Sequence, residues 1–344
     1  MTLIDPRFDA RNEFIHRCGL TGSAVTALKG DASFRRYFRL LPDGGTSLIL
    51  MDDPPPHNQT AAFAILARGL RAAGFSAPNI VAEDVSQGFL LLEDLGLQTY
   101  SQALAAGADE TALYEAATGV TLALHRCRTV DLASLPAYDF ALYCQELELF
   151  PGWYLPALGS RPSPAALADY QSRWRAVLAP ILAARRVLVL RDFHVDNLMV
   201  LNREGVAGVG LLDFQDAAAG HPVYDLVSLL DDARRQVAPA VVSQSSARFR
   251  TETGQSAADF DRDFAILSLQ RNLKILGIFV RLAVRDRKPG YLDFIPHLWS
   301  LVSARQDHPE LASVKGWLAE HCPQAMRRQP TAAEIAAAMD SLAR

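Results

Sequence analysis

The hydrophobic pattern of the chain changes near residue 96, and this change constrains the fold more than any other feature of the sequence. Between residues 24 and 93, apolar residues follow the two-residue period of β-strands, whereas after residue 96 they mostly follow the period of helices. A chain of 344 residues also exceeds the roughly 250–300 residues that a single hydrophobic core covers. We therefore expect an α+β protein with a small β-rich lobe, a connector at residues 93–97 and a larger helical lobe.

Residues 34–41 give the clearest evidence for a strand in the first part of the chain. Aromatic or apolar side chains alternate there with arginines, as in a half-exposed antiparallel strand. Pro42–Gly45 has the composition of a hairpin turn, and residues 47–51 form the predicted return strand. The other predicted elements of this part are strands at 24–28, 80–83 and 88–93 and one helix at 58–73. Together they predict a small antiparallel sheet with one helix.

The rest of the chain is predicted to be mainly helical, with a boundary between the two lobes after residue 94, so that they span residues 1–94 and 95–344. A short strand at 187–190 and a hairpin from 198–201 to 209–212 interrupt the helical pattern. The predicted helices lie at 110–126, 164–184, 224–234, 260–285 and 331–343.

The charge balance limits the ligands that the chain can hold. Its 34 basic and 38 acidic residues give a net charge of −4, which disfavours general nucleic-acid binding because that needs a basic face. An anionic ligand would have to be held by locally placed arginines or by a metal. Only four of the basic residues are lysines, namely Lys29, Lys274, Lys288 and Lys315.

The sequence predicts a cytoplasmic protein. Residues 1–13 lack the apolar run of a secretory signal. The most apolar long segment, residues 273–284, contains Lys274 and Arg281 and is shorter than the roughly 20 residues of a membrane helix. The four cysteines are widely spread, which favours buried free thiols. We expect a monomer or weak homo-oligomer that binds a small molecule and neither nucleic acid nor a membrane.

The residues with the clearest chemical meaning lie between 190 and 215. Asp192 ends a predicted strand, Asn197 follows five residues later, and Asp213 ends the second strand of the predicted hairpin. This arrangement gathers two carboxylates and an amide at one loop edge. Such oxygen ligands suit Mg²⁺, and phosphoryl transfer needs a carboxylate to accept the hydroxyl proton together with metal ligands. The alternative is that these residues only cap helices and turns.

On these residues the chain resembles the aminoglycoside phosphotransferase and choline kinase family, small-molecule relatives of the protein kinases. The family's Asp-x-His-x-x-Asn loop matches Asp192, His194 and Asn197, and its metal-binding aspartate matches Asp213. The resemblance extends from about residue 24 to 300. It implies a protein-kinase-like bilobal fold, ATP as cosubstrate, Asp192 as catalytic base, and Asn197 and Asp213 as ligands of Mg²⁺. It also implies that the first lobe binds the nucleotide and that the second holds the catalytic loop and the acceptor.

Four further segments, at 30–39, 47–52, 91–96 and 271–279, together resemble bacterial kinases that phosphorylate the anomeric hydroxyl of N-acetylmuramate or N-acetylglucosamine. Those enzymes make the sugar 1-phosphate in peptidoglycan recycling. The resemblance therefore implies the same reaction here. Two alternatives remain, a kinase acting on another hydroxyl, such as that of an aminoglycoside or amino alcohol, and a nucleotide-binding protein without transfer activity.

The chain departs from the family at the positions that handle ATP. Leu190 and Arg191 stand where the family often has His-Gly, and residues 47–52 contain no lysine where the third strand usually has one. The helix at 58–73 also lacks an acidic residue that could pair with such a lysine. We infer that Lys29 or an arginine, such as Arg36 or Arg39, contacts the phosphates, since an arginine fork is well shaped for this.

The candidate nucleotide contacts lie in the first lobe. Backbone amides of the loop 29–33, with Ser33 as a further donor, could cover the phosphates, and the main chain of Glu93 and Leu95 could pair with adenine. The alternative for Arg35, Arg36 and Arg39 is a solvated strand face. The residues predicted to bind the nucleotide are Lys29, Gly30, Ser33, Arg36, Glu93 and Leu95.

The sugar is expected to contact the helical lobe, facing Asp192. Aromatic rings stack on sugar faces and carboxylates pair with their hydroxyls, which makes Glu146 and Trp153 candidates. His194, Asp232 and Arg234 are the other candidates. The alternatives are a core helix around Glu146, a structural His194 that fixes the loop, and an Asp225 that caps its helix and braces the catalytic loop.

Overall fold

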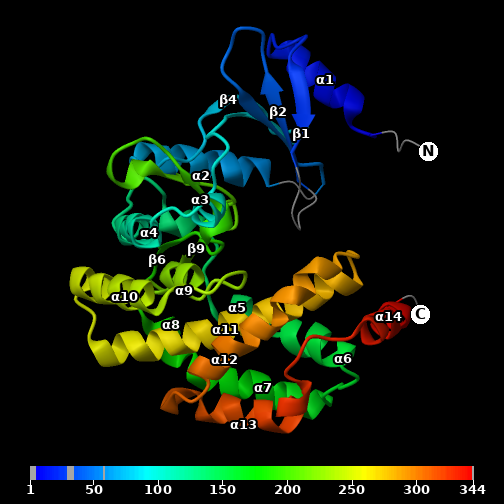
Figure 1. Cartoon of the computed structure of the whole chain (residues 1–344), viewed down its shortest axis with the longest axis vertical. Helices are drawn as coiled ribbons and strands as arrows, with labels where there is room; N and C mark the ends of the chain where they lie inside the picture. The colour runs from blue at the N-terminus through cyan, green and yellow to red at the C-terminus, as the bar shows by residue number, and fades with distance from the viewer. Residues whose placement is uncertain (1–4, 29–34, 57–58, 343–344) are drawn as a thin grey trace. The chain divides into compact units, whose positions relative to one another are not determined.

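The computed structural model of the chain describes residues 5–28, 35–56 and 59–342 (Figure 1). Its internal contacts divide the chain into two compact units. The first unit comprises Met1–Asp109, Cys127–Asp131 and Val195–Asp216, and the second comprises Glu110–Arg126, Leu132–His194 and Ala217–Arg344. The α+β class predicted from the sequence is confirmed, with most strands in the first unit and most helices in the second.

The first unit is built on a five-stranded antiparallel sheet in the order β1-β2-β3-β5-β4. The hairpin predicted around Pro42–Gly45 is present, because Phe38 of the second strand pairs with Leu50 of the third. The alternation of residues 36–41 buries Phe38 and Leu40 on one face. The strands are β1 (Ala24–Ala27), β2 (Arg36–Leu41), β3 (Leu48–Asp52), β4 (Ile80–Asp84) and β5 (Phe89–Glu93).

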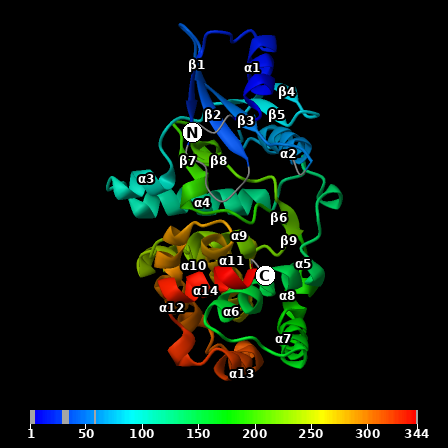
Figure 2. The ribbon, with the colours of Figure 1, turned by 90° about the vertical axis from the view of Figure 1, so that its right-hand side faces the viewer.

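Two helices lie beside this sheet (Figure 2). The helix α2 (Thr60–Ala72) was predicted, whereas α1 (Phe8–Arg17) was not. The helix α1 packs Phe14 and Ile15 into the core of the sheet, where Phe14 stacks on Phe89 with 5.4 Å between ring centroids. A short helix α3 (Tyr100–Ala105) follows the connector.

The predicted hairpin is formed by β7 (Leu198–Val200) and β8 (Val209–Leu211), and it joins the first unit. Isolated β-bridges connect Thr99 to Met199 and Ser76 to Gly210. The two units therefore do not divide at residue 94 as expected. Backbone pairing attaches this hairpin to the part of the chain that the sequence pattern had separated from it.

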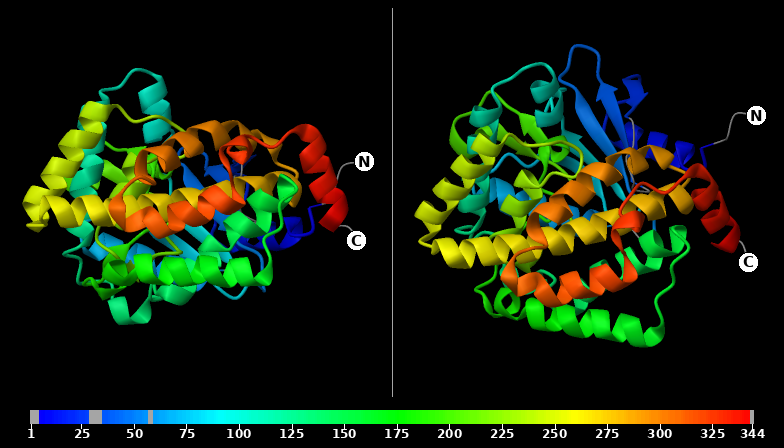
Figure 3. Two further views of the ribbon diagram at one scale, coloured as in Figure 1. Left: turned by 90° about the horizontal axis from the view of Figure 1, so that it is seen from below. Right: turned by 60° about the horizontal axis from the view of Figure 1, so that its bottom comes forward.

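The second unit is organised around the 28-residue helix α11 (Ala257–Val284), coloured yellow to orange in Figure 3. It contacts α5, α9, α12 and α14, and Gly277 allows it to cross the backbone at Leu149 closely. The other α-helices of at least five residues in this unit are α4 (Glu110–Leu124), α5 (Phe140–Leu147), α7 (Pro164–Val177), α8 (Ala179–Ala183), α9 (Tyr224–Leu230), α10 (Pro239–Thr253), α12 (Ile295–Arg305), α13 (Ala312–His321) and α14 (Ala332–Leu342).

The single helix predicted at 164–184 is two helices, α7 and α8, because Pro180 lacks the amide that would continue the helical hydrogen bonds. The strands β6 (Val187–Val189) and β9 (Ala218–Gly220) form a two-stranded sheet, and the loop that contains Asp192 follows β6. No helix among the described residues is long and apolar enough to cross a membrane.

Candidate active site

Asp192 follows β6 in the second unit, directly after a residue in an unusual backbone conformation. Arg191 has φ 70°, in the left-handed region that L-residues rarely adopt. The backbone amides of Leu190 and Arg191 donate to the two carboxylate oxygens of Asp225 at 2.7 and 2.9 Å. The Ser228 hydroxyl donates to the Arg191 carbonyl at 3.2 Å. The helix α9 thus holds both ends of this peptide segment. Asp225 braces the loop as predicted, but it does not cap its helix, because the N-cap residue of α9 is Val223.

The pKa of Asp225 reflects its enclosed position. The residue is 2 % exposed, and burial, reinforced by the negative charge of Asp192, raises its pKa to about 7 although the two backbone amides favour the charged form. A carboxylate with two short amide hydrogen bonds is well suited to fix a loop.

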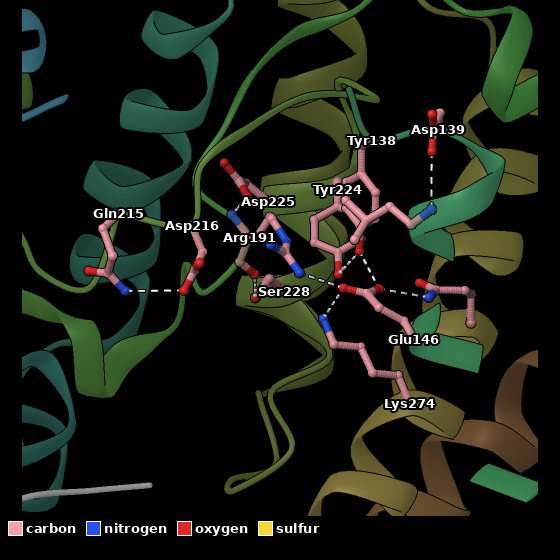
Figure 4. A network of polar contacts seen from close by, with 12 residues as sticks. Tyr138, Asp139, Glu146, Arg191, Gln215, Asp216, Tyr224, Asp225, Ser228 and Lys274 are labelled. Carbon is pink, nitrogen blue, oxygen red and sulfur yellow. Dashed lines mark hydrogen bonds and ion pairs between the residues drawn. The ribbon is translucent and has the colours of Figure 1, made fainter. Parts of the chain in front are cut away.

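The side chain of Arg191 belongs to a buried charge cluster in the second unit (Figure 4). Glu146 of α5 is 5 % exposed. One of its carboxylate oxygens accepts hydrogen bonds from Arg191 Nη2 and from Lys274 Nζ, each at 2.6 Å. Its other oxygen accepts hydrogen bonds from Gln270 Nε2 at 3.0 Å and from the Tyr138 hydroxyl. A sugar hydroxyl would have to displace one of these donors to reach Glu146.

The cluster keeps its charges despite burial. Burial would raise the pKa of Glu146, but Lys274 and Arg191 outweigh it and lower this pKa to about 2. Burial likewise would lower the pKa of Lys274, and the Glu146 carboxylate reverses that, so the pKa of Lys274 is raised. The set therefore holds one anion and two cations.

Three of the predicted sugar contacts lie together in the second unit. His194 is 7 % exposed, and its Nε2 lies 3.4 Å from Arg234 Nη1. Asp232 is 1 % exposed and accepts a hydrogen bond from the Arg234 backbone amide at 2.8 Å. Trp153 is half-buried in the helical turn Phe150–Tyr154, on another segment of the chain.

Asn197 and Asp213 lie at the open end of the β7–β8 hairpin in the first unit. The Leu212 amide donates to the Asn197 carbonyl at 3.0 Å, which continues the strand pairing up to these residues. Asp213 has φ 54°, and its carboxylate accepts a hydrogen bond from Gln215 Nε2 at 2.9 Å. Gln215 also donates to Asp216 at 3.2 Å (Figure 4). The hairpin thus brings the two predicted metal ligands to one end, as expected from the sequence.

The donor set at this end suits Mg²⁺. It consists of a carboxylate and an amide oxygen, and Mg²⁺ is commonly held by one or two carboxylates together with substrate phosphates and water. Among residues 5–28, 35–56 and 59–342, no three His, Cys, Asp or Glu side chains gather in the manner of an all-protein metal site. The carboxylate of Asp213 and the amide of Asn197 are of the ligand type that Mg²⁺ takes together with phosphates and water.

Arg35, which precedes β2, and Arg36 and Arg39 of β2 have different partners. Arg36 donates to Asp5 at 2.7 Å and to Asp52, and Arg39 binds Asp94 at 2.6 Å. Arg35 is 5 % exposed and reaches the metal-ligand candidate: its Nη1 lies 3.5 Å from Asp213 Oδ1. Its Nε also lies 3.6 Å from Asp53 Oδ2. The sequence singled out Arg36 for the phosphates, whereas the structure brings Arg35 to Asp213.

The structure describes only two of the other residues predicted to bind the nucleotide. Lys29, Gly30 and Ser33 lie outside the described residues. Glu93 ends β5, and its carboxylate pairs with Arg203 at 2.7 Å and Arg71 at 3.0 Å. Leu95 is buried in the segment that follows. The main-chain role predicted for Glu93 and Leu95 stays a prediction.

Sequence reasoning gave no role at the site to Gln215 or Gln59. Gln215 stood inside the motif after Asp213, so its position was a usable signal. Gln59 contacts Arg35 at 3.1 Å and Asp216 at 2.8 Å, which no local pattern could have shown.

Comparisons with a family profile and with known protein sequences both identify phosphotransferases as relatives. The sequence profile of the phosphotransferase enzyme family matches residues 24–263. An N-acetylmuramate/N-acetylglucosamine kinase of Caulobacter vibrioides is 36% identical over 95% of this chain and 100% of its own length. A protein of the same name from Pseudomonas aeruginosa is 40% identical over 86% of this chain and 87% of its own length.

Solved structures share the fold at low sequence identity. A choline/ethanolamine kinase family protein from Mesorhizobium loti has a TM-score of 0.60 at 18% identity, covering 91% of this chain and 98% of its own. An aminoglycoside phosphotransferase in a ternary complex with AMP-PNP and hygromycin B has a TM-score of 0.61 at 13% identity, covering 88% of this chain and 100% of its own.

Proposed function

This chain belongs to the phosphotransferase enzyme family, and from that premise we propose that it is an ATP-dependent sugar kinase. Its acceptor is the anomeric hydroxyl of N-acetylmuramate, N-acetylglucosamine or both, and its product is the sugar 1-phosphate. The observation that carries this proposal is the 36% identity to a kinase of that name along 95% of the chain. The reaction belongs to peptidoglycan recycling and takes place in the cytoplasm, where ATP is available.

Asp192 acts as the general base in this proposal. It accepts the proton of the anomeric hydroxyl as that oxygen attacks the γ-phosphorus. The bond between the γ-phosphorus and the bridging oxygen breaks, and ADP leaves with the bonding electron pair. Mg²⁺, held by Asn197 and Asp213, would supply positive charge to the phosphates. The protein contributes mainly by positioning and by fixed charges.

We assign the phosphate-binding cation to Arg35. Its contact with Asp213 supports this choice, since a guanidinium beside a metal-binding carboxylate is well placed for a phosphate oxygen. The ion pairs of Arg36 with Asp5 and of Arg39 with Asp94 occupy those two guanidinium groups elsewhere in the first unit. Lys29, Gly30 and Ser33 remain candidates for the phosphates, and the main chain of Glu93 and Leu95 for adenine.

His194, Trp153, Asp232 and Arg234 are our candidates for the sugar. The contact between Arg234 and His194, together with the burial of Asp232 beside the Arg234 backbone, supports grouping these three residues, and His194 lies two residues after Asp192 in the chain. Arg234 is a cation that could meet the lactyl carboxylate of a muramate.

An acceptor panel tests the proposed function. ADP release would be measured with N-acetylmuramate, N-acetylglucosamine, choline and an aminoglycoside, each with Mg²⁺ and ATP. We expect release with one or both amino sugars, and phosphorus NMR of the product should show an anomeric phosphate. Release only with choline or the aminoglycoside would identify a different kinase. Nucleotide binding without release on any acceptor would support a protein that lacks transfer activity.

A further inference from the structure

The peptide segment that leads to Asp192 is held in a conformation that its sequence disfavours. Arg191 has φ 70°, where the Cβ of an L-residue crowds the backbone. Such a conformation persists only where surrounding contacts impose it. Because Asp192 is the next residue, the backbone of Arg191 sets the direction in which Asp192 leaves the strand.

The helix α9 contacts the backbone of this segment. Asp225 accepts the amides of Leu190 and Arg191, and Ser228 donates to the Arg191 carbonyl. These hydrogen bonds restrain the segment, but they would be available to any residue type at position 191. They do not explain why an arginine stands there.

The Arg191 side chain binds Glu146 of α5, and that carboxylate is held in turn by α11. Glu146 of α5 binds Arg191 Nη2 at 2.6 Å. The side chain of Arg191 is 19% exposed and that of Glu146 is 6% exposed. Lys274 of α11 binds the same carboxylate oxygen at 2.6 Å. The opposite oxygen is occupied by Tyr138 and Gln270. The four donors come from three segments, because Lys274 and Gln270 both belong to α11. They leave Glu146 little freedom to rotate, so the end of the Arg191 side chain is fixed (Figure 4).

We propose that Glu146, supported by Lys274, is a positioning residue that anchors the Arg191 side chain, keeps the Arg191 backbone left-handed and thereby aims Asp192. The inference rests on the proposed function, because it takes Asp192 as the catalytic base. It gives Glu146 a role different from the sugar contact that the sequence suggested.

Glycine at position 191 separates the two roles of Glu146. Glycine adopts positive φ without strain, so a chain with Arg191→Gly needs no side-chain anchor there. If Glu146 acts through Arg191, the Glu146→Gln substitution should matter only while Arg191 is present. If Glu146 touches the sugar, the substitution should matter equally in both backgrounds.

The test is a double-mutant cycle with steady-state kinetics on the acceptor sugar. In the natural background, Glu146→Gln should lower kcat by about 10- to 100-fold, as a small misplacement of a catalytic group does, with little change in the KM for the sugar. In the Arg191→Gly background, the same substitution should lower kcat by less than about threefold. An equal loss in both backgrounds, or a rise in the KM for the sugar as the main effect, would overturn the inference.

Lys274→Met provides a milder variant in case Glu146→Gln fails to fold. It removes the supporting cation and keeps the Glu146–Arg191 pair, so we expect a smaller loss of kcat that again disappears in the Arg191→Gly background. Lys315→Met is the matched control, since its ion pair with Asp307 is 50% and 70% exposed, and it should leave kcat unchanged.

Hydrogen exchange tests the anchor without any substrate. The backbone amides of residues 190–192 should exchange faster in Glu146→Gln than in the natural protein, and the substitution should add no further increase in the Arg191→Gly background. Unchanged exchange in Glu146→Gln would refute the anchor. This outcome is independent of the acceptor panel, where absence of ADP release with every acceptor would instead refute the proposed function.

Discussion

Backbone strain is concentrated at residues with proposed chemical roles. Among the described residues, positive φ at non-glycine positions occurs at Arg191, Asp213 and Arg287. One of these precedes the proposed base, and one is a proposed metal ligand. The left-handed conformation costs an L-residue about 1–2 kcal/mol, which a single charge-assisted hydrogen bond of about 1.5–3 kcal/mol can offset. Hydrogen bonds are present at both sites, from Gln215 to Asp213 and from Arg191 to Glu146.

Replacement of Asp192 tests the assignment of the base. Asp192→Asn keeps the size of the side chain and removes its ability to accept a proton. We expect kcat to fall by about 10²–10⁴-fold, the usual contribution of general base catalysis, while the affinity for Mg·ATP changes little. Steady-state kinetics and a direct nucleotide-binding measurement would check this. Activity close to that of the natural protein would remove Asp192 from the mechanism.

Replacement of Arg35 tests the phosphate contact. Arg35→Ala should raise the KM for ATP by about 10- to 100-fold, which corresponds to the loss of a charge-assisted bond of about 1.5–3 kcal/mol. Arg35→Lys should recover part of the loss, because it restores the charge without the fork. Arg68→Ala, which breaks an ion pair with Glu83 between side chains that are 56% and 38% exposed, is the control. Equal KM values for ATP in Arg35→Ala and Arg68→Ala would contradict the assignment.

At the scale of elements, short strand pairs place the chemistry and one long helix supports it. The β7–β8 hairpin needs only three residue pairs to bring Asn197 and Asp213 to one end. The helix α11 supplies Lys274 and Gln270 to Glu146, so its placement against α5 matters for the charge cluster. That placement depends on a close approach at Gly277, where an added Cβ would lie 2.2 Å from the Leu149 carbonyl oxygen.

Gly277→Ala should therefore destabilise the protein. The backbone at Leu149 cannot move aside as a flexible side chain could, and overpacking of this kind costs about 1–3 kcal/mol. Gly316→Ala in α13 is the matched control, because its nearest neighbour would be an Arg173 nitrogen at 3.4 Å, and alanine favours a helix by roughly 0.5–1 kcal/mol. Urea unfolding of both variants would measure the difference. If the Gly277→Ala protein were as stable as the control, α11 and the backbone at Leu149 would not be closely packed.

At the scale of the whole molecule, the net charge of −4 does not show how individual buried acidic groups make stability depend on pH. In the second unit, Glu146 and Asp225 have opposite pKa shifts, lowered to about 2 and raised to about 7. A lowered carboxyl pKa makes stability rise with pH, and a raised one makes it fall with pH, each between the unfolded and folded pKa values.

The acid stability of the protein should depend on Glu146. Its stabilising contribution is fully present above its ordinary pKa of 4.5 and is lost as the pH falls toward 2. The free energy of unfolding of Glu146→Gln should therefore lie below that of the natural protein by a few kcal/mol at pH 6, and the gap should narrow at pH 3. Urea unfolding at the two pH values would measure it. A gap that does not depend on pH would show that the carboxylate charge is not what stabilises the cluster.

Local patterns in the sequence determined much of this protein. Alternation and turn residues predicted the five strands of the sheet and both strands of the later hairpin, since these depend on neighbours along the chain. The motif at 192–213 also identified the residues that we propose as the base and the metal ligands. The helix α1 was missed because its apolar residues are few, and their burial became visible only when they packed on the sheet.

The tertiary structure alone decided which charged side chains meet. Arg35 and Asp213 are 178 residues apart in the chain, Glu146 and Arg191 are 45 apart, and Glu146 and Lys274 are 128 apart. With 34 basic and 38 acidic residues, the sequence permits very many pairings, and residue type does not choose among them. The packing of the strands and helices chooses, because burial makes an unpaired charge costly and admits only the partners that the fold brings within reach.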